Sequence, residues 1–107
     1  MAENIEKIKK LAGLVKLNPE DSFSKFALAL ELMKQNEVSK ARVLFESVLA
    51  QDPEYLGVYY HLGKLYERIN LDKKAVSIYQ DGVKVARKQG NQRTESELKD
   101  ALELLTF

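Results

Sequence analysis

The chain lacks cysteine and tryptophan altogether, and its 107 residues include a single histidine. Without cysteine there are no disulfides, zinc–thiolate sites or cysteine nucleophiles, and this suits the cytoplasm, where we expect the protein to be. The histidine, His61, has no second histidine and no compact acidic loop near it, so the sequence predicts no metal site. It also lacks an adjacent proton acceptor for acid–base catalysis. We therefore expect no cofactor and no enzymatic activity.

Neither sign of charge dominates, and no long apolar run occurs. The chain has 17 basic and 16 acidic residues, which gives a formal net charge of +1. This balance provides no general attraction to nucleic acid or to an anionic membrane. No apolar run approaches the roughly 20 residues of a membrane-spanning helix, and the first residues lack the apolar stretch of a secretory signal. We expect neither nucleic acid nor membrane as a partner.

Only two prolines and five glycines interrupt the chain, which predicts long secondary-structure elements. Apolar residues recur at helical spacing, and the sequence predicts helices over residues 3–17, 22–35, 40–51, 55–69, 72–89 and 92–106. Asn18-Pro19 and Asp52-Pro53 end the first and third of these, because the residue before proline avoids the helical conformation. The candidate N-caps are Asp21 or Ser22, Ser39, and Asp72.

The stretch 59–66 carries the strongest pattern in the chain. Four of its residues share one helical face at i, i+3, i+4 and i+7, namely Tyr59, Leu62, Gly63 and Tyr66. Gly63 lies inside the predicted helix, where glycine costs about 1 kcal/mol relative to alanine. Close approach of a second helix would offset that cost. Ala75 and Tyr79 on the next predicted helix supply a small residue and a ring for this contact.

A shift of 34 residues maps this pattern onto an earlier part of the chain. The earlier residues at the same offsets are Lys25, Leu28, Ala29 and Leu32. The identical pairs are Pro19/Pro53, Glu20/Glu54, Leu28/Leu62, Asn36/Asn70, Lys40/Lys74 and Ala41/Ala75. Most fall at turns, helix breaks or small-residue contacts, and asparagine tolerates the left-handed conformation at a helix end. The pattern resembles the tetratricopeptide repeat, a helix–turn–helix unit of 34 residues.

This resemblance implies an all-α fold, with about six helices stacked as antiparallel pairs in a short right-handed superhelix. A single domain over residues 1–107 would comprise an N-terminal helix, repeats over 22–51 and 55–89, and a capping helix over 92–106. The capping helix has leucines on one face and acidic residues elsewhere, as a terminal helix requires for solubility. Two residues depart from the family pattern. Gly82 replaces the usual alanine, and Arg87 replaces the closing proline.

The resemblance also implies a function. In the family, the first helix of each pair lines a concave groove that binds an extended or helical segment of another protein. Carried over position by position, the partner-binding residues are Phe23, Phe26, Leu30 and Met33, followed by Tyr60, His61, Lys64 and Glu67. The first three could instead pack against the N-terminal helix. We expect a protein-interaction adaptor or scaffold that is a monomer or weak homo-oligomer, the alternative being a structural self-association module that uses the same apolar groove.

The groove residues also predict the kind of ligand. Some family members hold a C-terminal carboxylate with a clamp of basic and amide side chains, but the corresponding positions here carry Phe26, Leu30, Gly57 and His61. These residues lack the paired charged donors that a carboxylate needs. The expected ligand is therefore an amphipathic helix with apolar anchors.

Two further expectations concern the second half of the chain. A basic cluster, formed by Lys84, Arg87, Lys88 and Arg93, leaves single-stranded RNA as an alternative ligand. The acidic residues Glu95, Glu97 and Asp100 are expected to face this cluster.

At Gly63 we expect substitution by leucine to destabilise the fold. Alanine should be accepted there, since Ala29 occupies the equivalent position.

Overall fold

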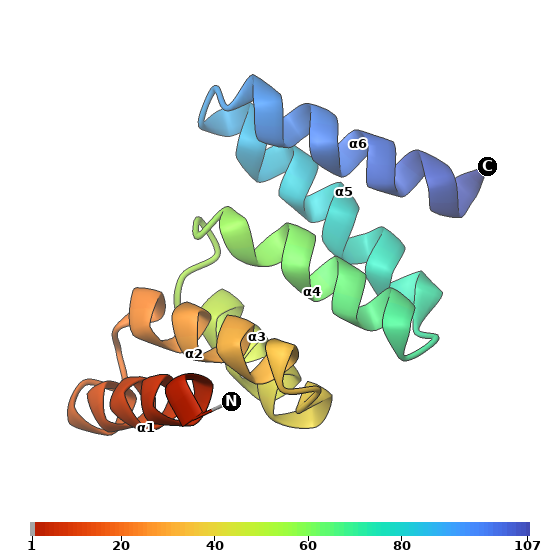
Figure 1. The fold of residues 1–107 in the computed structure, drawn as a ribbon. Coiled ribbons are helices and arrows are strands. Elements are labelled where there is room, and N and C mark those ends of the chain that lie inside the picture. The colour runs from red at the N-terminus through yellow and green to blue at the C-terminus, as the bar shows by residue number, and fades with distance from the viewer. Residues whose placement is uncertain (1) are drawn as a thin grey trace. The chain divides into compact units, whose positions relative to one another are not determined.

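The computed structural model describes the backbone of residues 2–107 and the side chains of residues 4–107, so Met1 lies outside the described residues. The helices are α1 (Ala2–Leu17), α2 (Ser22–Lys34), α3 (Val38–Gln51), α4 (Gly57–Arg68), α5 (Asp72–Lys88) and α6 (Gln92–Thr106) (Figure 1). No strand occurs in this described part of the chain. The all-α fold and the six predicted helices are confirmed.

Three helices end in the same kind of turn. Asn36, Asn70 and Gly90 adopt the left-handed conformation, with φ of 62°, 63° and 69°. In each turn the next residue donates its N–H to the carbonyl five positions earlier, and these bonds are Glu37 to Leu32 (2.9 Å), Leu71 to Tyr66 (2.8 Å) and Asn91 to Ala86 (2.9 Å). This is the Schellman arrangement, which satisfies carbonyls at the end of a helix. The left-handed role predicted for Asn36 and Asn70 is confirmed.

Of the three predicted N-caps, one is confirmed and two are wrong. The Asp21 carboxylate accepts a bond from the Phe23 N–H at 3.2 Å, so Asp21 caps α2, and α6 begins at residue 92 as predicted. Ser39 is not a cap, because α3 already begins at Val38. Asp72 is the first residue of α5 rather than its cap. The reason is the Schellman turn, since the residue after the left-handed asparagine leads directly into the next helix.

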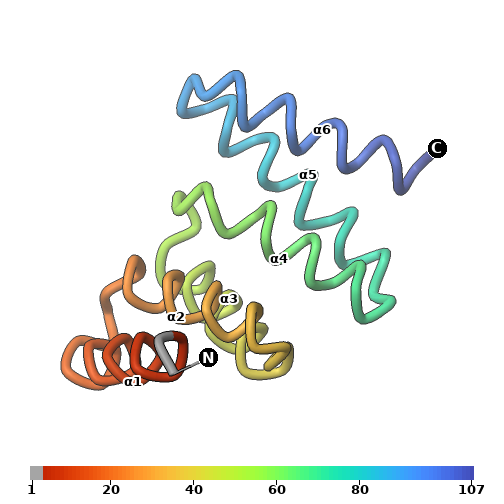
Figure 2. The backbone as a smooth tube through the Cα atoms, viewed as in Figure 1, coloured from red at the N-terminus to blue at the C-terminus, as the bar shows by residue number. Residues whose placement is uncertain are grey.

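The chain divides into two compact units, Met1–Tyr55 and Leu56–Phe107, and each is described by itself. In the first unit, α2 packs against both α1 and α3 (Figure 2). Its most buried apolar side chains are Leu28, Ala29, Leu32, Ala41, Phe45 and Val48. They lie at the spacing expected for the inward faces of α2 and α3, and the predicted helix pair is therefore present here.

A buried lysine holds the place of an aromatic ring in the first unit. Lys25 stands where the second repeat has Tyr59, and only 8% of it is exposed. Its Nζ donates to the Ser47 hydroxyl at 2.9 Å and to the Gln51 carbonyl oxygen Oε1 at 2.8 Å. The Gln51 amide in turn donates to the Ser22 hydroxyl at 3.0 Å. This network satisfies the buried ammonium group and ties α2 to the end of α3.

In the second unit, α5 lies between α4 and α6 (Figure 1). Two glycines allow these helices to approach closely. A Cβ on Gly63 would lie 2.2 Å from a ring carbon of Tyr79, and a Cβ on Gly82 would lie 2.7 Å from the Cβ of Tyr59. The predicted close approach at Gly63 is confirmed, but the expectation that alanine fits there is wrong, because the Tyr79 ring fills the space.

The last helix covers the outer side of α5, as predicted for a capping helix. Leu98 is fully buried, Ala101 is 4% exposed, and the Leu98 side chain lies 3.0 Å from where a Cβ on Gly82 would be.

In the described part of the chain, no helix is both long and apolar enough to cross a membrane.

Candidate functional site

The residues predicted on α2 differ in how far they are free to contact a partner. Phe23 is 65% exposed, whereas Leu30 and Met33 are half-buried. The ring of Phe26 packs at centroid distances of 6.0 Å from Phe45 and 5.2 Å from Tyr55. Phe23 is therefore an open apolar side chain and is not buried against α1. Phe26 contributes to the packing of its own unit.

In the second unit, a hollow of about 240 Å³ lies between α4 and α6. Its lining residues are Tyr60, Lys64, Glu97, Asp100, Ala101 and Leu104, and we call it the α4–α6 hollow. The Nζ of Lys64 lies 5.6 Å from the centroid of the Tyr60 ring. The ring of His61 meets the same ring edge-on at 5.8 Å. Three of the four residues predicted on α4 therefore lie together at this hollow or beside it.

The fourth predicted residue, Glu67, serves the interior of the unit. Its carboxylate accepts a hydrogen bond from the hydroxyl of Tyr79, a fully buried side chain of α5. Desolvation raises the pKa of Tyr79 far above its ordinary value, so the hydroxyl stays a donor. The same carboxylate lies 3.6 Å from the Nζ of Lys64. Glu67 therefore joins α4 to α5 and holds Lys64 at the rim of the hollow.

The charges of the α4–α6 hollow are unevenly compensated. Lys64 is paired with Glu67, and Glu97 is paired with Arg93 at 3.3 Å. Within the described residues, the carboxylate of Asp100 has neither an ion pair nor a hydrogen bond. Leu104 is 76% exposed beside it. The hollow thus has an acidic and apolar wall on α6, facing an aromatic and basic wall on α4.

Sequence reasoning expected Glu97 and Asp100 to face the basic cluster and did not assign Leu104 to a contact surface. One signal could have found them. Leu98, Ala101 and Leu105 follow the spacing of the face turned to α5, but Leu104 falls outside that spacing. It shares its own face with Glu97 and Asp100, at i, i+3 and i+7. An isolated apolar residue on an acidic face marks a second contact surface of the helix.

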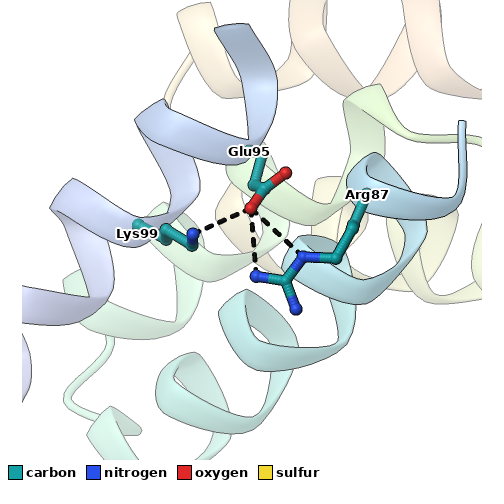
Figure 3. Close-up of polar contacts among 3 residues, drawn as sticks. All are labelled: Arg87, Glu95 and Lys99. Atoms are coloured by element: carbon teal, nitrogen blue, oxygen red, sulfur yellow. Dashed lines mark hydrogen bonds and ion pairs between the residues drawn. The ribbon is translucent and has the colours of Figure 1, made fainter. Parts of the chain in front are cut away.

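The basic cluster predicted around α5 is partly neutralised (Figure 3). The Glu95 carboxylate accepts from Lys99 at 2.8 Å and from Arg87 at 3.0 Å. Lys99 foremost, together with Arg87, holds the pKa of Glu95 below its ordinary value. Arg93 is paired with Glu97 at 3.3 Å, so two of the four basic side chains of the cluster, Arg87 and Arg93, have a carboxylate partner. The predicted pairing of Glu95 with Arg87 is confirmed, whereas Glu97 pairs within α6.

A second hollow belongs to the first unit and is almost wholly apolar. It measures about 410 Å³. The residues that line it are Ile8, Ala12, Leu28, Leu32, Lys40, Val43 and Leu44, and we call it the α1–α3 hollow. Val43 is 65% exposed there, as much as Phe23 is on α2. Sequence reasoning did not predict this surface.

The described residues contain no group of three or more histidine, cysteine, aspartate or glutamate side chains that could hold a metal ion. Desolvation lowers the pKa of His61, the one histidine, so its ring is neutral at pH 7. The ring of Tyr60 lies next to it. The α4–α6 hollow presents a concave surface with apolar and charged side chains to a ligand.

Comparison with known proteins identifies the fold. A family model described as tetratricopeptide repeat matches residues 32–94. A tetratricopeptide repeat domain protein from Salinibacter ruber, known from a crystal structure, is 45% identical, with 80% of this chain and 96% of that chain covered at a TM-score of 0.77. A comparison with curated proteins found no match.

Two more distant structures share the fold over nearly the whole chain. The TPR2B domain of yeast Sti1, solved as a complex with pHsp70, is 14% identical, with 98% of this chain and 84% of that chain covered at a TM-score of 0.89. The type III secretion translocator chaperone SycD from Yersinia enterocolitica is 13% identical, with 98% and 73% covered at a TM-score of 0.89. The paired helices, the left-handed turns and the family match agree, and the chain belongs to the tetratricopeptide repeat family.

Proposed function

We propose that this protein binds segments of a partner protein through an exposed face on each of its two units, α2 in the first unit, and α4 with α6 in the second. The observation that carries the proposal is the exposure of a large apolar side chain on α2 and of another on α6. Phe23 is 65% exposed and Leu104 is 76% exposed. Burial of such a side chain contributes about 1.5–3 kcal/mol, so a partner that covers them gains affinity. The family resemblance supports the faces of α2 and α4, because the first helix of each pair in the family lines the groove that binds segments of other proteins.

The chemistry of these faces favours a ligand with apolar anchors. The positions that would form a carboxylate clamp carry Phe26 and Leu30 on α2, and Gly57 and His61 on α4. The first two are apolar, glycine has no side chain, and the ring of His61 is neutral at pH 7. An amphipathic helix, with apolar residues at i and i+3 or i+4, matches Phe23 and Leu30 better than an acidic terminus does.

The proposal is tested by measuring the affinity of a captured partner for matched variants. Phe23→Ala and Tyr60→Ala should each weaken binding by about 2 kcal/mol, as aromatic anchors commonly do. Phe26→Ala is a poorer test, because its ring packs on Phe45 and Tyr55 and its loss would also cost stability. Val43→Ala is the matched control, since Val43 is as exposed as Phe23 but lies on α3.

Two results would overturn the proposal. A partner whose affinity survives both Phe23→Ala and Tyr60→Ala but is lost with Val43→Ala would move binding to the α1–α3 hollow. Self-association that depends on concentration and disappears in Phe23→Ala would favour the structural alternative. Sedimentation of the chain without a partner, over a range of concentrations, distinguishes that alternative from an adaptor.

A further inference from the structure

The α4–α6 hollow contains one carboxylate that the protein leaves without a partner. Lys64 is compensated by Glu67 at 3.6 Å and lies near the Tyr60 ring. Glu97 is compensated by Arg93 at 3.3 Å. Asp100 is the remaining charged group of the lining, and within the described residues its carboxylate has no ion pair or hydrogen bond. A ligand in this hollow therefore meets one uncompensated negative charge.

The same hollow carries apolar surface directly beside that charge. Leu104, one turn after Asp100 on α6, is 76% exposed. The Tyr60 ring lines the hollow from α4 and is half-buried. A long side chain with an apolar stem and a polar end matches this combination, because the stem can cover Leu104 while the end reaches the carboxylate.

The charge expected of the ligand follows from comparing how an acidic, an apolar and a basic side chain would interact with Asp100. An acidic side chain would meet the carboxylates of Asp100 and Glu97, and like charges repel. A purely apolar side chain would remove water from Asp100 without replacing the lost hydrogen bonds, which is unfavourable. A basic side chain covers the apolar surface and also donates to the carboxylate.

We propose that the α4–α6 hollow receives a lysine or arginine side chain of the bound segment, with Asp100 as the acceptor of its charge. This inference rests on the proposed function and adds the chemistry of one position in the ligand. The partner segment then carries a basic residue beside its apolar anchors. A ligand held by a carboxylate clamp instead presents a negative charge.

A random-peptide library displayed on phage tests the inference with the 107-residue chain as target. Peptides should first be retained only if Phe23→Ala or Tyr60→Ala weakens their binding. Among those, we expect a lysine or arginine next to apolar residues. Asp100→Asn should weaken such peptides by about tenfold, the change expected for a charged hydrogen bond. Asp81→Asn, an exposed aspartate of α5, is the matched control and should leave binding unchanged.

A charge exchange makes the test specific to the contact. Asp100→Lys should abolish binding of the basic peptide, and replacing the peptide's basic residue by glutamate should restore it. Retained peptides that are acidic, that lack charge, or that ignore Asp100→Asn would overturn the inference while leaving the proposed function intact. If no retained peptide depends on Phe23 or Tyr60, the proposed function fails together with the inference.

Discussion

The buried ring of Tyr79 lies against the backbone of Gly63, and its hydroxyl is held by Glu67 one helical turn further along α4. The hydrogen bond holds the ring beside Gly63, and movement of the ring away from Gly63 would strain this bond. The equivalent positions 34 residues earlier are Phe45 and Ala29. There the ring has no hydroxyl, and Met33 stands where Glu67 would be, so no equivalent hydrogen bond holds the ring beside Ala29.

We predict that Gly63→Ala destabilises the protein despite the better helix propensity of alanine. The added Cβ would lie 2.2 Å from a ring carbon of Tyr79. Overpacking of this kind costs about 1–3 kcal/mol, which exceeds the gain of about 1 kcal/mol in helix propensity. Urea unfolding followed by circular dichroism measures the difference. Gly63→Leu should cost several kcal/mol more.

If the hydroxyl of Tyr79 causes the loss of stability in Gly63→Ala, then removing that hydroxyl should reduce the loss. In a Tyr79→Phe background the ring is no longer tied to Glu67, and Gly63→Ala should then cost less than in the wild type. Such non-additivity is expected for two residues in contact. Equal costs in the two backgrounds would show that the ring is fixed by its packing and that the bond to Glu67 does not matter.

A buried carboxylate in the first unit makes stability depend on pH. Glu31 is 5% exposed, and its Oε1 lies 3.1 Å from Lys7 of α1 and 3.2 Å from Lys34. The hydrogen bond from Lys7 is the largest influence, and the pKa of Glu31 falls below its ordinary value of 4.5. Because the pKa is depressed in the folded state, the stabilisation is present above 4.5 and is lost as the pH falls through the folded pKa.

We therefore predict that Lys7→Met flattens the dependence of stability on pH below about pH 5. At neutral pH the loss should be about 1 kcal/mol or less, because Lys7 is itself 60% exposed. Thermal unfolding at a series of pH values measures both effects. Lys10→Met, at an exposed position of the same helix, should keep the wild-type profile. Identical profiles for the two variants would show that Lys7 does not set the pKa of Glu31.

Gly90 provides a test of the left-handed turns. Its φ is 69°, close to the values at Asn36 and Asn70, and an added Cβ would meet nothing within 4 Å. Any cost of a substitution therefore comes from the backbone conformation. We predict that Gly90→Ala loses about 1–2 kcal/mol, whereas Gly90→Asn loses much less, as asparagine already serves at the other two turns. Equal unfolding free energies for the two variants would contradict this account.

Much of the fold was predictable because it depends on local rules. Apolar spacing gave helices whose bounds differ from the observed ones by at most two residues, as at Val38. The left-handed asparagines followed from their place after each helix. The N-caps failed at Ser39 and Asp72, because the short Schellman link, rather than a capping side chain, determines where the next helix begins.

Contacts between distant side chains could not be derived from spacing. Lys25 occupies an aromatic position, and its acceptors Ser47 and Gln51 are more than twenty residues away along the chain. Spacing did not predict the ion pair between Lys7 of α1 and Glu31 of α2 either. The candidate site was predicted in part. Tyr60 and Lys64 line the α4–α6 hollow, but its opposite wall on α6 depends on how that helix packs, which a repeat pattern does not specify.

The last prediction concerns α6, which both covers α5 and forms one wall of the α4–α6 hollow. Truncation after Gly90 removes Leu98, a fully buried side chain, and uncovers Val83 and Ala86 of α5, which are 9% and 0% exposed. Exposed apolar surface of this kind promotes aggregation, so light scattering should rise and helicity should fall. Leu98→Ala in the full chain should cost about 2–5 kcal/mol for the same reason, while Glu103→Ala, at an exposed position of α6, should cost little. A truncated chain that stays monomeric and fully helical would show that α6 is not needed to cover α5. In that case the same truncated chain, now without Asp100, would show directly whether peptides with a basic residue still bind.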